Sequence, residues 1–63
     1  MVRWNESENR YTEAADVDAF VADIVAVCRK HNMTIDYRGS TGPFTVMRGY
    51  FDVDMIENAH VSG

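Results

Sequence analysis

The segment from Glu13 to His31 constrains the fold of this 63-residue chain more than any other feature. Its large apolar residues recur every three or four positions, which is the period of one face of an α-helix. They are Val17, Phe20, Val21, Ile24, Val25, Val27 and Cys28. Thr12 is a suitable N-cap, and Asn32 can adopt the left-handed conformation that commonly ends a helix. The pattern therefore predicts one long amphipathic helix that needs another element to cover its apolar face.

The sequence after this helix alternates between apolar and polar side chains, as a half-buried strand does. Expected to face the core are Met33, Ile35 and Tyr37, and expected to face water are Thr34, Asp36 and Arg38. A loop over 39–43 then leads to a second strand over 44–50, with Phe44 and Val46 inward. The two strands are predicted to form an antiparallel hairpin.

The two ends of the chain give weaker patterns. A short helix is expected from Asp52 to about Val61, with Asp52 as its cap and Phe51 packed on Ile56 as a hydrophobic staple. Residues 1–11 are compatible with a short strand followed by a turn, and equally with a mobile arm.

These elements predict an α+β fold for residues 1–63, taken as one small domain. The long helix in the N-terminal half packs on a two- or three-stranded antiparallel sheet, and a short C-terminal helix follows. A sheet this thin is expected to leave one face and at least one strand edge open, and an open edge can pair with another chain.

The charges are distributed unevenly along the chain. The net charge is −4, from ten acids and six Lys or Arg residues. Residues 1–23 hold six of the acids and two of the bases, so the whole excess lies in the first third. Direct nucleic-acid binding is not expected, because phosphate contacts need a basic patch. The imbalance favours a partner with a basic surface, although a solvated helix face would have the same composition.

No segment predicts export or membrane insertion. The first residues lack the basic and apolar pattern of a secretory signal, and no apolar run is long enough to cross a bilayer. A cytoplasmic location is therefore the expectation. Cys28 is the sole cysteine, so no disulfide can form within the chain.

No residue set specifies a reaction, and the chain is predicted not to be an enzyme. Cys28 and His31 are three residues apart on the predicted helix, which would suit a thiolate–imidazole pair or part of a metal site. Cys28 belongs to the apolar stripe, however, where a lone cysteine usually packs as a small hydrophobe. His60 is expected at the inner face or rim of the last helix. We expect no catalytic residue, metal or cofactor.

Aromatic and acidic side chains are the best candidates for a partner-binding site. Seven large rings exceed the space in a core this small, and exposed Trp or Tyr residues often anchor protein–protein contacts. The predicted partner-binding residues are Trp4, Glu6, Glu8, Tyr11, Glu13, Asp16, Asp23 and Tyr50.

The middle of the chain resembles small uncharacterised accessory proteins of tailed bacteriophages. The resemblance spans residues 23–46, including the run from Asp23 through His31 to Ile35 and the later run 42–46. Those proteins often carry His and acidic residues in the hairpin turn, where this chain has 38–41 as Arg-Gly-Ser-Thr. The resemblance implies a protein that binds and blocks a host machine, such as a CRISPR surveillance complex or another defence nuclease.

Together, these observations predict a non-enzymatic, phage-encoded inhibitor of the anti-CRISPR type. It would bind a host protein or ribonucleoprotein complex with a basic surface through its own acidic surface. The alternative is a homo-oligomeric structural or virion-associated protein that pairs through its open sheet, and a homodimer is compatible with both hypotheses. A thiol- or metal-dependent enzyme is the third hypothesis.

Overall fold

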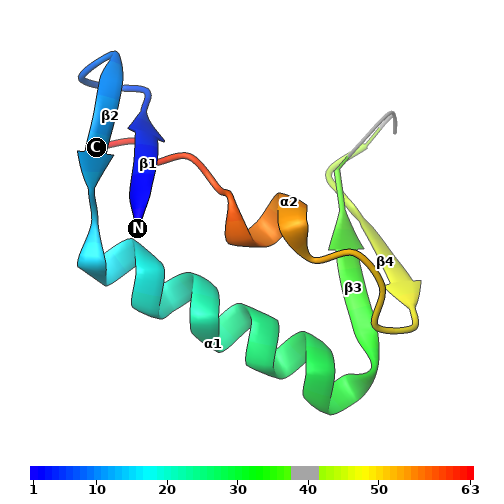
Figure 1. Ribbon diagram of the computed structural model, residues 1–63. Coiled ribbons are helices and arrows are strands. Elements are labelled where there is room, and N and C mark those ends of the chain that lie inside the picture. The colour runs from blue at the N-terminus through cyan, green and yellow to red at the C-terminus, as the bar shows by residue number, and fades with distance from the viewer. Residues whose placement is uncertain (38–41) are drawn as a thin grey trace.

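The computed structural model describes residues 1–37 and 42–63, and it consists of two hairpins joined by one long helix (Figure 1). Strands β1 (Val2–Asn5) and β2 (Arg10–Glu13) form the first hairpin, and β3 (Met33–Asp36) and β4 (Thr45–Arg48) form the second. Helix α1 (Ala15–His31) lies between them in sequence, and α2 (Asp54–Glu57) follows. The α+β class, the long helix and the short C-terminal helix are confirmed.

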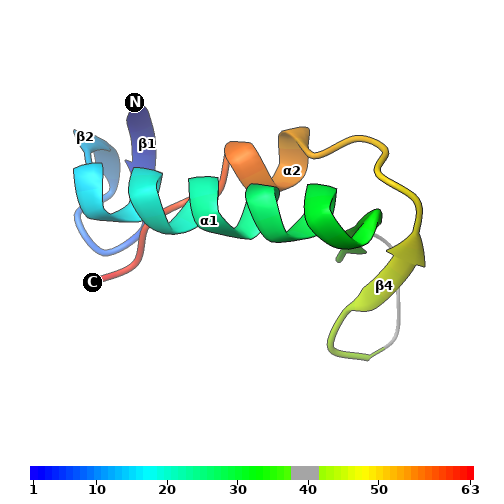
Figure 2. The same ribbon diagram turned by 90° about the horizontal axis from the view of Figure 1, so that it is seen from below.

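The expected single sheet is replaced by two separate antiparallel pairs, one at each end of α1 (Figures 1 and 2). The N-terminal residues pair with the segment that directly precedes the helix, in the register Val2↔Glu13 to Asn5↔Arg10. The length of α1, about 25 Å at 1.5 Å per residue, then holds this hairpin away from the second one. Of the two alternatives for residues 1–11, the strand and turn are therefore found.

Helix α1 ends where the sequence predicts but starts two residues later. Thr12 and Glu13 are the last residues of β2, so the expected Thr12 cap does not form, and Ala14 is the residue before the first turn. At the other end Asn32 has φ 54° and ψ 51°, and its N–H donates to the Arg29 carbonyl over 3.3 Å. The left-handed stop at Asn32 is confirmed.

The C-terminal segment returns to the first hairpin instead of continuing as a helix. The Val61 N–H donates to the Trp4 carbonyl over 2.8 Å, and the Glu6 N–H donates to the Val61 carbonyl over 2.7 Å. Val61 therefore forms a parallel bridge to β1 at Asn5. The prediction of a helix to residue 61 was wrong, because these residues make their hydrogen bonds to another element.

The inward and outward faces of the second hairpin differ from the prediction. Thr34 is buried with 3% of its surface exposed, whereas Met33 is 38% exposed. The Thr34 hydroxyl donates to the Gly49 carbonyl (2.9 Å) and accepts from the Phe51 N–H (3.2 Å), so its polar group is satisfied in the interior. Arg38 lies outside the described residues.

Phe44 and Val46, expected inward, are also exposed. Phe44 keeps 48% and Val46 55% of its surface accessible, because the hairpin extends away from the end of α1 and no helix covers its far half (Figure 1).

The connection from β4 to α2 depends on Gly49. Its φ of 117° suits glycine, and a Cβ there would lie 2.5 Å from Cζ of Phe51. Phe51, expected to staple onto Ile56, thus places its ring against Gly49 and stays 59% exposed. The predicted cap is partly present, since Asp52 accepts a hydrogen bond from the Asp54 N–H over 2.9 Å.

The apolar interior is very small. Among the described residues, Val21 and Cys28 are the apolar residues that are buried, each with 6% exposure. The expectation that Cys28 packs as a small hydrophobe is confirmed. The stability of the chain therefore depends on polar contacts between elements as well as on its core.

Candidate binding surfaces

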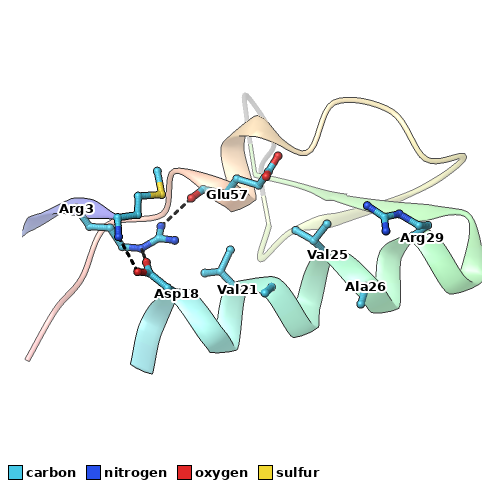
Figure 3. Close-up of a pocket in the computed structure, with 9 residues that line it drawn as sticks. Arg3, Asp18, Val21, Val25, Ala26, Arg29 and Glu57 are labelled. Atoms are coloured by element: carbon cyan, nitrogen blue, oxygen red, sulfur yellow. Dashed lines mark hydrogen bonds and ion pairs between the residues drawn. The ribbon is translucent and has the colours of Figure 1, made fainter. Parts of the chain in front are cut away.

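A buried arginine connects three parts of the chain (Figure 3). Arg3 is 4% exposed, and its Nε donates to Oδ1 of Asp18 on α1 over 2.7 Å. Its Nη1 donates to the carbonyls of Glu57 (2.7 Å) and Ala59 (3.0 Å) in and after α2. A buried charge is tolerated when it is paired and its donors are bonded, and Arg3 meets both conditions. The guanidinium thereby fixes the first hairpin on α1 and ends α2 early.

The same contacts shift two titrations. Hydrogen bonds from the Met1 ammonium and then from Arg3 lower the pKa of Asp18, because both donors favour the carboxylate. In return, hydrogen bonds to Asp18 and then to Glu13 raise the pKa of the Met1 ammonium. Asp18 is thus a structural carboxylate that stays ionised and bonded, which leaves it poorly suited to recognise a partner.

Three of the predicted acidic binding residues make ion pairs within the chain. These pairs are Glu6 with His60, Glu8 with Arg10, and Glu13 with the Met1 ammonium, at 3.1, 2.7 and 3.1 Å. All three pairs are largely exposed, and the Glu6–His60 contact is an ion pair only when the imidazole is protonated, so each adds little to stability and can exchange for a partner's cation. Asp16 and Asp23 are exposed and make no ion pair within residues 1–37 and 42–63.

The structure brings some of these acids together. Glu8, Glu13 and Asp16 line one polar hollow of about 470 Å³ beside the turn of the first hairpin, with Arg10 and Thr12. We call these three residues the acidic surface. Asp23 lies outside this hollow, two turns beyond Asp16 on the same side of α1, since seven residues span about two helical turns. Glu6 also lies outside it.

The predicted aromatic anchors separate into two places. Trp4 and Tyr11 are opposed across β1 and β2, with ring centroids 5.1 Å apart at an interplanar angle of 74°. Tyr11 is 68% exposed, and Glu13 projects from the same face of β2 because it is two residues away. Trp4, Tyr11 and the acidic surface therefore adjoin.

Tyr50 does not belong to this patch. It follows β4, which lies at the opposite end of α1 (Figure 1). Its ring lies under the Arg29 guanidinium, with Cζ of Arg29 5.6 Å from the ring centroid. Its backbone N–H donates to the Asn32 side chain over 2.9 Å. These contacts attach the chain after β4 to the end of α1.

The groups considered for chemistry do not converge. Cys28 is buried while His31 is exposed, and His60 bonds Glu6 at the other end of α1. In the described part of the chain, His, Cys, Asp and Glu side chains do not gather in groups of three that could hold a metal ion. Over the same residues, no helix combines the length and apolar character needed to cross a bilayer.

An apolar groove is the feature that sequence reasoning missed. It has a volume of about 510 Å³ and lies between α1, the second hairpin, α2 and the C-terminal segment. Its apolar walls include Phe20 and Ile24 of α1, Ile35 of β3 and Ile56 of α2. The excess of aromatic rings and the predicted open sheet face indicated that some apolar surface would stay exposed. They did not locate the groove, because its position depends on how the two hairpins are held apart.

No family model matches this chain, and neither a curated protein nor a solved structure matches it significantly.

Proposed function

We propose that this protein is a non-enzymatic binding protein that inhibits a basic, nucleic-acid-handling host complex by protein–protein contact. The host and the anti-defence role come from the resemblance to small phage accessory proteins. The observation that carries the proposal is the exposed Tyr11 ring, packed edge-on against Trp4 and two residues along β2 from Glu13, which belongs to the acidic surface of Glu8, Glu13 and Asp16. An aromatic anchor beside carboxylates suits a protein surface that is rich in Arg and Lys.

The electrostatic part of this proposal concerns both association rate and competition. Carboxylates on one end of a small protein raise its encounter rate with a basic surface, and the effect falls as salt is added. A protein bound there would occupy the positions that phosphates otherwise take. Inhibition then requires no catalytic group of its own.

The test compares two double variants with the same charge change. Glu8→Gln with Glu13→Gln removes two negative charges from the acidic surface, and Asp54→Asn with Glu57→Gln removes two around α2. Both pairs are exposed. Tagged proteins are used to capture host complexes from bacterial lysate, and the captured complex is eluted with a salt gradient. The first variant should release the complex at lower salt than wild type, whereas the second should match wild type.

A tyrosine pair tests the anchor separately. Tyr11→Ala should weaken binding about tenfold or more, as a central aromatic contact does, while Tyr50→Ala should leave it within about twofold. The patch is not the binding site if the two charge variants release the complex at the same salt concentration and the two tyrosine variants bind it with the same affinity.

A further inference from the structure

The apolar groove lies on a face that neither hairpin covers. Its lining residues come from four segments and include no Lys, Arg, Asp or Glu. They are Val17, Phe20, Val21, Ile24, Ile35, Tyr37, Phe44, Met55, Ile56, Ala59, His60, Val61 and Ser62. A groove of this composition offers apolar contact and few polar handles, so its natural occupant is another apolar surface.

The second hairpin extends this face beyond the groove. Ile35 and Val46 are directly paired across β3 and β4, so both project from the same side. The rings of Tyr37 and Phe44 continue that side, with centroids 5.8 Å apart. Tyr37, Phe44 and Val46 are 63%, 48% and 55% exposed, and Phe20 on α1 is 65% exposed. The result is one continuous apolar surface rather than scattered residues.

The chain also exposes more surface than its mass predicts. Its accessible area is 4742 Å² for 7.2 kDa. Folded monomers of that mass average about 4,100 Å². The surplus of about 600 Å² approaches the roughly 800 Å² that each partner buries in a standard interface. In its described part, the chain buries two apolar residues, Val21 and Cys28. Chains of this size commonly rely on self-association for part of their stability.

We propose that a second copy of this chain covers the groove and the adjoining hairpin face, forming a symmetric dimer. In a two-fold contact each copy presents the same surface, and an uncharged apolar face is complementary to itself. The surplus accessible area supports a second copy as the occupant of the groove, because dimerisation would bury this area on both chains at once. This inference does not rest on the proposed function, since Tyr11, Glu8 and Glu13 do not line the groove and only Asp16 of the acidic surface lies near its rim.

The effect of salt concentration distinguishes formation of this dimer from the binding of a basic partner. Asp16 and Asp23 flank Phe20 on α1, at four residues before it and three after it, so they lie at the rim of the proposed interface. Two copies would bring like charges together there, and added salt would screen their repulsion. The dimer should therefore strengthen or stay constant with salt, whereas partner capture should weaken.

The experiment is sedimentation equilibrium of the full chain from about 1 µM to about 1 mM, the range of ordinary dimer affinities. Wild type should approach twice the chain mass of 7.2 kDa. Val46→Lys and Phe20→Lys each place a charge on the proposed interface and should raise the dimer dissociation constant at least about tenfold. Both residues are more than half exposed, so the fold should tolerate the changes, and circular dichroism would verify this.

Met47→Lys is the matched control. Met47 is the next residue along β4, projects from the opposite side of the hairpin and is 37% exposed. The dimer dissociation constant of Met47→Lys should stay within about threefold of the wild-type value. Monomers at every concentration would overturn the proposal, and so would a dimer that responds equally to Val46→Lys and Met47→Lys. Neither result would affect capture by the acidic surface, so the two proposals can fail separately.

Discussion

The two hairpins are held in place by different kinds of contact. The first is held by the buried Arg3 and by the parallel bridge at Val61, and its inward residue Asn5 is 4% exposed with its Oδ1 accepting two turn N–H groups. The second is held through Thr34, and much of its apolar face is open. Hydrogen-bonded polar groups therefore fix the first hairpin. The apolar residues of the second hairpin remain exposed and available to contact another molecule. In this protein the polar end is fixed by bonded side chains, and the apolar end is the candidate for self-association.

The largest expected effect comes from removing the arginine that fixes the first hairpin. Arg3→Met keeps much of the apolar stem but leaves Asp18 and the Glu57 and Ala59 carbonyls without their donor, at a cost of about 2–4 kcal/mol. A chain of this size has about 3–5 kcal/mol in total, so the variant should be largely unfolded. Thermal unfolding followed by the fluorescence of Trp4, the sole tryptophan, measures it.

Arg10→Met in the same hairpin is the control for that change. Arg10 is exposed and pairs with the exposed Glu8, so the loss should be within about 0.5 kcal/mol. Similar melting temperatures for Arg3→Met and Arg10→Met would show that Arg3 does not hold the two ends of the chain together.

A smaller effect is expected at the attachment of the second hairpin. Thr34→Val keeps the shape of the side chain but leaves the Gly49 carbonyl and the Phe51 N–H without their hydroxyl partner, which should cost about 1–2 kcal/mol. Amide hydrogen exchange should accelerate in β3 and β4 more than in β1 and β2. Thr45→Val, at an exposed position of β4, should change little. An equal increase in both hairpins would mean that they open as one unit.

The smallest effect concerns acid stability. Because the pKa of Asp18 is lowered in the folded protein, its contribution to stability is present above about pH 5 and is lost as the pH falls below about 4. Asp18→Asn should therefore reduce stability at neutral pH and flatten the acid limb of a melting-temperature profile, whereas exposed Asp16→Asn should leave its slope unchanged. An unaltered slope for Asp18→Asn would show that its ion pairs do not contribute to folding.

Much of the fold follows from local patterns. The long helix α1 and its end at Asn32 depend on residues close in sequence, and the structure has both, whereas the alternation after Met33 buries Thr34 and not Met33. The length of the C-terminal helix was overestimated, because the Glu57 and Ala59 carbonyls bond Arg3, more than fifty residues away in the chain. Of the predicted site residues, Trp4 and Tyr11 adjoin through strand pairing, while Tyr50 is separated from them by the length of α1.

By itself, the sequence determined one long amphipathic helix, a hairpin after it and an acidic first third, because helical period, strand alternation and charge are properties of neighbouring residues. Only the tertiary structure decided that Arg3 is buried, that Thr34 rather than Met33 faces inward, and that Phe20, Ile35 and Val46 share an open face. Those outcomes depend on which distant groups can satisfy a buried donor or cover an apolar side chain, and that is settled only when all the elements pack together.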